Sequence, residues 1–150
     1  MKNYIIYISL TIILISCKKT ITTCNNANLN NKITIYGFST TIGIENLEAT
    51  IYEITKDTTP RKINIKNIYF SKDKYNYLNI ELDEDLFANN TYQLNLNDSI
   101  KYRISEIETF SEVRMIGIRK DSVCKTKSFK INNKKAEIFF TTGINFKIPK

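Results

Sequence analysis

The amino-acid sequence predicts an all-β protein, arranged as an antiparallel β-sandwich. From residue 32 onward, short runs rich in Ile, Tyr and Phe alternate with polar residues and are separated by Asn, Asp, Lys and Gly. In one run, Leu78, Ile80 and Leu82 alternate with Asn79 and Glu81. No long window carries an apolar stripe at the helical period. Closely spaced short strands are typical of a sandwich, and an up-and-down barrel is the alternative architecture.

Each expected strand begins and ends at a change in this alternation. The expected strands are Lys32–Phe38, Glu48–Ile54, Lys62–Phe70, Tyr75–Leu82, Thr91–Leu96, Ile100–Phe110, Val113–Arg119, Lys127–Ile131, Ala136–Phe140 and Ile144–Ile148. The nearest approach to a helix is Asp83–Phe87, which is long enough for a single turn. The sequence shows no internal repeat and no sign of a second domain, so residues 32–150 are expected to form one sandwich domain.

The segment from Leu86 to Leu96 carries a more specific pattern. Leu86 lies six residues before Tyr92, which is followed by alternating Leu94 and Leu96. This pattern resembles the tyrosine corner of fibronectin type III and immunoglobulin-like domains, in which the Tyr hydroxyl bonds to main chain upstream. Ala88 stands where those families often carry Pro, and the chain has no Trp. A Tyr that starts an ordinary strand is the alternative interpretation.

The N-terminal residues have the pattern of an export signal. One positive charge, Lys2, precedes the apolar run from Tyr4 to Ile15, which is too short to cross a membrane. The sequence Leu14-Ile15-Ser16-Cys17, followed by two lysines, resembles the lipobox of bacterial lipoproteins of the Bacteroidota type. The resemblance implies that residues 1–16 are a signal peptide and that Cys17 carries lipid as the first mature residue. An ordinary cleaved signal with an incidental Cys is the alternative.

The lipobox resemblance also implies a location. Residues 17–31 are polar and rich in Thr and Asn, and we expect them to form a flexible tether between lipid and domain. Lys18-Lys19 is not followed by the acidic pair that accompanies surface export in this lipoprotein type. We therefore expect a protein of the cell envelope, lipid-anchored to the outer membrane and facing the periplasm.

The cysteine count predicts a disulfide. The chain has three cysteines, and assigning Cys17 to lipid leaves Cys24 and Cys124. Both stand in polar segments of a protein expected in an oxidising compartment, so we predict that they are bonded. The bond would join the start of the domain to its C-terminal third, with Asn25–Asn31 against a loop after Arg119.

Several kinds of chemistry are excluded or disfavoured by composition. The chain has no histidine, which excludes Ser-His-Asp and Cys-His catalysis and removes the commonest zinc ligand. The four glycines are isolated, so no phosphate-binding loop is expected. We therefore expect no catalytic residues, no metal site and no cofactor.

The formal net charge of +7 raises the question of nucleic acid. The lysines are scattered among Asp and Glu without an Arg-rich stripe, and the expected location is outside the cytoplasm, so we expect no nucleic-acid partner. Attraction to anionic lipid headgroups or acidic glycans is the more natural consequence of this charge. A solvated surface with no partner is the alternative.

An aromatic segment is the candidate binding surface. Tyr69, Tyr75 and Tyr77 flank Lys72-Asp73, which we interpret as the turn of a hairpin. If the leucines that follow face the core, Tyr75 and Tyr77 face outward, while Tyr69 joins them or turns inward according to the register. Outward Tyr beside Asn and Lys suits contact with a sugar or a protein. Tyrosines that pair across strands only to stabilise the sheet are the alternative.

The sequence is compatible with three functions. The leading hypothesis is a lipid-anchored, non-catalytic envelope protein whose sandwich binds another envelope component, protein or glycan. The second is a periplasmic inhibitor or immunity lipoprotein that blocks a toxin or lytic enzyme, for which one protruding loop or strand is expected. The third is a barrel-type carrier of an apolar ligand, which requires an internal cavity.

Overall fold

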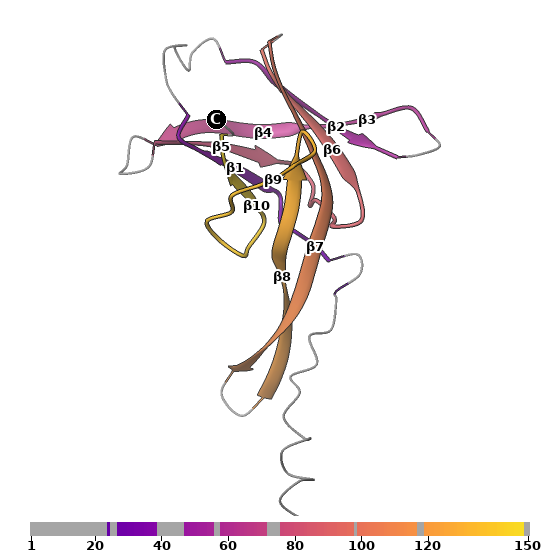
Figure 1. The fold of residues 1–150 in the computed structure, drawn as a ribbon, viewed down its shortest axis with the longest axis vertical. Helices are drawn as coiled ribbons and strands as arrows, with labels where there is room; N and C mark the ends of the chain where they lie inside the picture. Colours follow the sequence, from indigo (N-terminus) through magenta and orange to yellow (C-terminus); the bar gives the residue numbers. More distant parts are fainter. Residues whose placement is uncertain are drawn as a thin grey trace, which may run out of the picture.

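The structure is a computed structural model that describes residues 24, 27–38, 47–55, 58–71, 76–97, 99–116 and 119–148. Its strands form two sheets that pack against each other without closing into a barrel (Figure 1). This confirms the predicted β-sandwich and excludes the barrel alternative for the described residues. Within these residues, no helix is long and apolar enough to cross a bilayer.

The first sheet has four strands in the order β10-β1-β5-β4. Its strands are β1 (Lys32–Tyr36), β4 (Ile65–Ser71), β5 (Tyr77–Leu82) and β10 (Ile144–Lys147). β1 runs antiparallel to β5 and parallel to β10. The sheet is therefore mixed, because the last strand of the chain lies beside the first in the same direction.

The second sheet has six strands in the order β3-β2-β6-β7-β8-β9, and all its pairs are antiparallel. Its strands are β2 (Ala49–Ile54), β3 (Arg61–Ile63), β6 (Thr91–Leu96), β7 (Ile100–Ile116), β8 (Arg119–Ile131) and β9 (Lys134–Lys135).

The strand order reproduces that of an immunoglobulin-like sandwich. β3-β2-β6-β7 corresponds to strands C′-C-F-G, and β1-β5-β4 corresponds to B-E-D. β10 occupies the edge that strand A takes in that fold, although it comes from the end of the chain. The parallel β1–β10 pair departs from the fully antiparallel sandwich that the sequence predicted.

The tyrosine corner is present where the sequence predicted it. Tyr92 is only 1% exposed, and its hydroxyl accepts a hydrogen bond from the Phe87 amide at 2.6 Å. The same hydroxyl donates to the Phe87 carbonyl at 3.0 Å. Leu86 is fully buried beside it. This arrangement fixes the entry of β6 into the second sheet.

The core lies between the two sheets and follows the alternation read from the sequence. Phe146 of the first sheet meets Tyr102 and Phe129 of the second edge-on, with ring centroids 5.3 Å and 6.3 Å apart. Buried apolar side chains come from both inner faces: Ile33, Ile35, Leu78, Ile80 and Leu82 on one, and Ile51, Leu94, Leu96, Ile104 and Ile131 on the other.

Several boundaries differ from the sequence prediction, and the expected strand Lys62–Phe70 is two strands, β3 and β4, which belong to different sheets. Ala27 and Leu29 are buried in the core, and the Leu29 amide donates to the Leu86 carbonyl at 2.7 Å. The expected tether over residues 17–31 is therefore too long, because its last part belongs to the domain. The expected strand Ala136–Phe140 is wrong, since this segment carries no strand and folds back over the sheet that contains β10.

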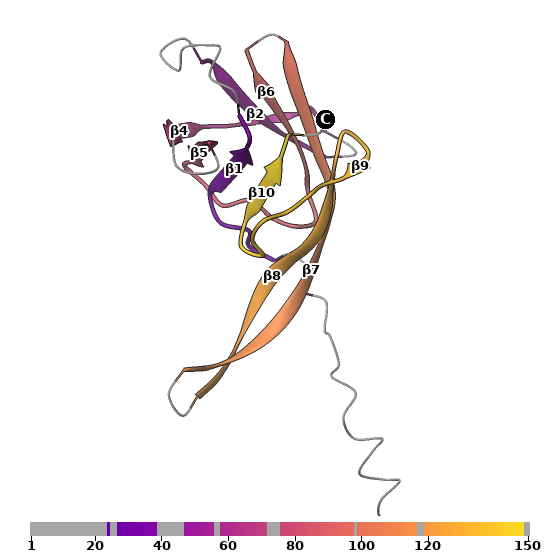
Figure 2. The same ribbon diagram turned by 60° about the vertical axis from the view of Figure 1, so that its left-hand side comes forward.

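The two strands expected at Ile100–Phe110 and Val113–Arg119 are largely one strand, β7. Only its first part, Ile100–Ile104, pairs with β6. The register with β8 then shifts between Ser105 and Thr109, where Glu106 has a positive φ of 51°. Such irregularities bend a strand and increase its twist. Beyond this point β7 and β8 leave the sandwich as a long two-stranded hairpin (Figures 1 and 2).

Candidate functional site

The structure describes four of the six residues singled out from the sequence. Cys24 and Cys124 form the predicted disulfide, with their Cα atoms 5.9 Å apart. Cys124 lies within strand β8 and not in the loop that the sequence predicted. Cys17 and Tyr75 lie outside the described residues.

Tyr69 and Tyr77 lie on the β4–β5 hairpin and face away from the core. The register pairs Tyr69 with Asn79 and Ser71 with Tyr77, which puts all four residues on the outer face of the first sheet. This settles the position of Tyr69, which the sequence left open. Tyr69 accepts a hydrogen bond from Lys32, whose Nζ lies 5.0 Å from the ring centroid.

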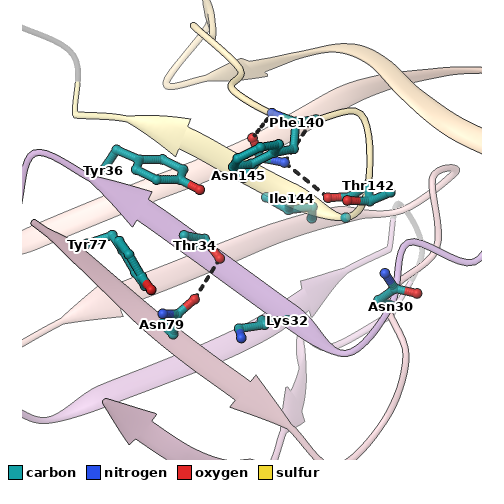
Figure 3. A pocket seen from close by; sticks show the side chains of 11 residues that line it. Asn30, Lys32, Thr34, Tyr36, Tyr77, Asn79, Phe140, Thr142, Ile144 and Asn145 are labelled. Carbon is teal, nitrogen blue, oxygen red and sulfur yellow. Dashed lines mark hydrogen bonds between the residues drawn. The ribbon is translucent and has the colours of Figure 1, made fainter. Parts of the chain in front are cut away.

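A hollow of about 270 Å³ lies on this outer face, between β5 and the segment that precedes β10 (Figure 3). Its walls come from β1, β5, β10 and the loop before β10. The lining side chains are mostly polar or aromatic: Lys32, Thr34, Tyr36, Tyr77, Asn79, Phe140, Thr142 and Asn145.

The floor of the hollow holds a polar group without a partner. Asn79 is 2% exposed, and its Oδ1 accepts a hydrogen bond from the Thr34 hydroxyl at 2.8 Å. Its Nδ2 has no hydrogen-bond acceptor among the described residues. A buried donor without an acceptor costs about 1–3 kcal/mol. Native structures tolerate such groups rarely, and each one needs a physical explanation.

Asn145 holds the opposite wall in place. Its Oδ1 accepts hydrogen bonds from the amides of Phe139 and Phe140 at 2.9 and 2.8 Å. Its Nδ2 donates to the carbonyls of Phe140 and Thr142 at 2.8 and 3.1 Å. All four hydrogen-bonding positions of this buried amide are used, so the loop that carries the two rings is held from its own strand.

Gly143 closes the same loop as it enters β10. Its φ is +69°, and a Cβ at this position would lie 3.0 Å from the Leu29 carbonyl oxygen. Thr126 of β8 donates a hydrogen bond to the Gly143 carbonyl at 2.9 Å. Only glycine combines this backbone conformation with such a close approach, and the turn ties the wall of the hollow to both sheets.

Aromatic rings form the rim. The Tyr36 ring centroid lies 4.3 Å from that of Phe139, 5.7 Å from that of Tyr77 and 6.3 Å from that of Phe140. Phe140 remains 59% exposed, whereas Tyr36 is buried beneath the group. Burial raises the pKa of Tyr36, and Tyr77 adds to the rise, so the Tyr36 hydroxyl is protonated at neutral pH.

The arrangement of the described residues has the features of a binding site. Among the described residues that line the hollow, Lys32 is the one ionisable group besides the two tyrosines. Among the described residues, no group of three or more Cys, Asp or Glu side chains could hold a metal ion. A polar floor beneath a partly exposed aromatic rim can bind a small, largely uncharged ligand.

Sequence reasoning found part of this site. It selected Tyr69 and Tyr77, but it missed the Thr34–Asn79 pair, Asn145 and Phe140. Phe140 was assigned to a strand because Ile138-Phe139-Phe140 is an apolar run. The Thr-Thr-Gly sequence that follows it was the available sign of a turn that exposes the ring.

Comparison of the chain with protein-family models, with curated proteins and with solved structures finds no match. The function of this chain is therefore inferred from its own geometry and sequence.

Proposed function

We propose that this chain is a lipid-anchored, non-catalytic protein of the cell envelope whose sandwich binds a neutral glycan in the outer-face hollow. One observation carries the proposal: the Asn79 amide has no acceptor and lies at the floor of a hollow with an exposed Phe140 ring at its rim. A ligand oxygen that accepts from Asn79 would remove the cost of the buried donor.

A sugar ring fits these two features together. The C–H face of a pyranose stacks on an aromatic ring, while its hydroxyls accept from amides and donate to carbonyl or hydroxyl oxygens. Phe140 supplies the exposed face, and Thr34, Asn79 and Tyr36 supply polar atoms nearby. The hollow of about 270 Å³ lies just below the usual range of about 300–1,000 Å³ for small-molecule sites, which suits one or two sugar units.

The envelope location rests on the sequence around Cys17 and on the disulfide. Bonds between cysteines persist in oxidising compartments outside the cytoplasm, and Cys24–Cys124 fits such a location. The lipobox resemblance at Leu14 to Cys17 adds the anchor. An anchored binding module keeps its ligand at the membrane surface without chemistry of its own.

Binding of the purified protein to an immobilised panel of neutral oligosaccharides tests the proposal. The panel contains glucose, galactose, mannose and N-acetylglucosamine chains. Phe140→Ala is expected to weaken capture about tenfold, equivalent to roughly 1.4 kcal/mol, because the stacking face is lost. Phe87→Ala is the matched control, since Phe87 is also partly exposed but lies outside the hollow. Equal losses in both variants, or no capture by the wild type, would contradict the proposal.

A further inference from the structure

The end of the β7–β8 hairpin exposes apolar side chains beyond the sandwich. Val113 and Met115 are 63% and 64% exposed, the highest values among large apolar side chains of the described residues. Val113 pairs with Ser122, and Met115 pairs with Lys120 across the hairpin. Alternate residues of a strand share a face, so the two apolar side chains lie together on one side of the hairpin.

The sequence at the same end of the hairpin has an excess of basic residues, with Glu112 and Asp121 on its two sides. The sequence from Val113 to Lys120 contains three basic residues and no Asp or Glu. Arg114 lies between the two exposed apolar residues, is half-exposed, and forms an ion pair with Glu112 at 3.2 Å. An apolar pair combined with cations is the composition that binds the interface of an anionic bilayer.

The disulfide relates this hairpin to the N-terminus. Cys124 pairs with Ser111, so it lies on the same face as Val113 and Met115. Cys24 is bonded to Cys124, and its carbonyl accepts a hydrogen bond from Thr109 of β7 at 2.7 Å. The N-terminal segment is therefore attached to the hairpin at two points.

The chain length between Cys17 and Cys24 limits how far the hairpin can be from the membrane. Cys24 is seven residues after Cys17, and an extended chain spans at most about 25 Å over that length. The hairpin continues five residues beyond Ser111 to the end of β7, which is about 17 Å of strand. The two lengths are comparable, so the hairpin can bridge the distance from the disulfide to the bilayer.

We infer that the end of the β7–β8 hairpin, with Val113, Arg114 and Met115, is a second membrane contact that docks on the anionic lipid surface. The inference rests on the proposed lipid anchor at Cys17. The apolar pair enters the boundary between headgroups and acyl chains, about 5–10 Å deep, while Arg114 contacts lipid phosphates. Two contacts, one of them rigid, fix the orientation of the sandwich on the membrane.

A projecting hairpin is also what an inhibitor of a lytic enzyme would present. Two observations favour the bilayer instead. The apolar pair lies on the face to which the N-terminal segment is bonded, and the basic sequence from Val113 to Lys120 complements anionic lipid. A protein partner for this surface is a result that the following experiment would expose.

The absence of tryptophan from the chain provides a specific probe. Met115→Trp places a single fluorophore at a largely exposed position, so unfolding should be unchanged. The full-length lipidated variant is reconstituted into vesicles of phosphatidylethanolamine and phosphatidylglycerol with brominated acyl chains. Several-fold quenching and a shift of emission to shorter wavelength are expected. Tyr52→Trp, on β2 in the body of the sandwich, is the control and should remain unquenched.

Vesicle flotation separates the anchor from the hairpin contact. Cys17→Ala should not be lipidated and should not float. If M115W floats but is quenched no more than Y52W, the hairpin contact is wrong while the anchor stands, and a protein partner becomes the better assignment. If M115W does not float, both the anchor and the contact that rests on it are overturned. Adding Arg114→Glu to M115W should reduce the quenching, which would support a role for the positive charge of Arg114 in lipid binding.

Discussion

At the scale of one residue, Tyr92 holds the main-chain turn that leads into β6. Its hydroxyl both accepts from the Phe87 amide and donates to the Phe87 carbonyl, while its ring is buried in the core. The Phe87 amide therefore depends on one side chain for its acceptor, whereas Leu86 and Ala88 on either side bond to the main chain of residues 27–30. The spacing from Leu86 to Tyr92 was enough to predict this contact from the sequence.

Replacing Tyr92 by Phe is expected to lower the free energy of unfolding by about 1–2 kcal/mol, because the Phe87 amide loses its acceptor. Chemical denaturation measures the change. Tyr102→Phe is the matched control: Tyr102 is also buried, at 6% exposed, and no hydrogen bond of its hydroxyl occurs among the described residues. A loss in the control as large as in Tyr92→Phe would contradict the role of the corner.

Tyr92 also predicts a dependence of stability on alkaline pH. Burial raises the pKa of Tyr92 above its ordinary value of 10.0. A raised pKa in the folded state means that the protonated hydroxyl stabilises the fold fully below about pH 10 and that this contribution is lost as pH rises through the folded value. Stability of the wild type should fall in this range more steeply than that of Tyr92→Phe.

The polar residues of the hollow could not be predicted in the same way. Asn79 stands between the buried residues Leu78 and Ile80 and has the pattern of an exposed strand residue, yet the loop before β10 covers its face. Asn145 was likewise indistinguishable from the many other Asn residues of the chain. Their burial depends on a contact between distant segments, which local alternation does not encode.

At the scale of one element, the β7–β8 hairpin explains the position of the disulfide at Cys124. β6 pairs with β7 only as far as Ile104, and β9 pairs with β8 only at Lys130 and Ile131, so the outer part of the hairpin has two strands. Two-stranded ribbons are marginally stable in water. The bond to Cys24 and the hydrogen bond from Thr109 attach a third segment where the sheet can no longer stabilise the ribbon.

Removal of the disulfide should therefore weaken the hairpin first. For a separation of 100 residues, the chain-entropy account gives a stabilisation of up to about 4–5 kcal/mol. The double variant Cys24→Ser, Cys124→Ser is expected to lose much of this stabilisation, as measured by chemical denaturation. Limited proteolysis should cut the variant within β7 or β8 before it cuts the sandwich. Ser122→Ala, an exposed change on the same strand, should behave as the wild type.

Most single elements were predictable because their alternation is local. Thr91–Leu96 was predicted with the bounds that the structure shows. The length of β7 was not, because the sequence around Ser111 and Glu112 is polar on both faces of a ribbon that has no core to cover. A strand that leaves the sandwich loses the alternation by which strands are recognised.

At the scale of the whole molecule, the order of the strands carries information that the sequence pattern lacks. β10 is a short alternating run like several others, and nothing local indicates that it pairs in parallel with β1. That pairing places the loop with Phe139 and Phe140 over the outer face of the first sheet. The hollow in which we propose glycan binding therefore depends on the pairing of β10 with β1.

In the proposed arrangement, the lipid anchor and the hairpin hold the domain at a membrane, and the hollow binds ligand on an outward face. The hollow belongs to the outer face of the four-stranded sheet, whereas the hairpin extends from the six-stranded sheet. A hairpin in contact with lipid therefore uses a different part of the fold from the ligand site. Membrane attachment and glycan binding should be separable by mutation.

We propose that the Thr34–Asn79 pair serves the binding of a ligand and not the stability of the fold. The double variant Thr34→Val, Asn79→Leu replaces both polar partners by apolar side chains of similar size, which removes the unpaired donor. Such paired replacements are nearly neutral or stabilising for a fold. The measurement compares the double variant with the wild type in free energy of unfolding and in affinity for the oligosaccharide that the wild type captures.

We predict that the double variant loses at least about tenfold in affinity, or roughly 1.4 kcal/mol of binding free energy, while its stability is unchanged or increased. Unchanged affinity with a clear loss of stability would contradict the account, since the pair would then serve only the sheet.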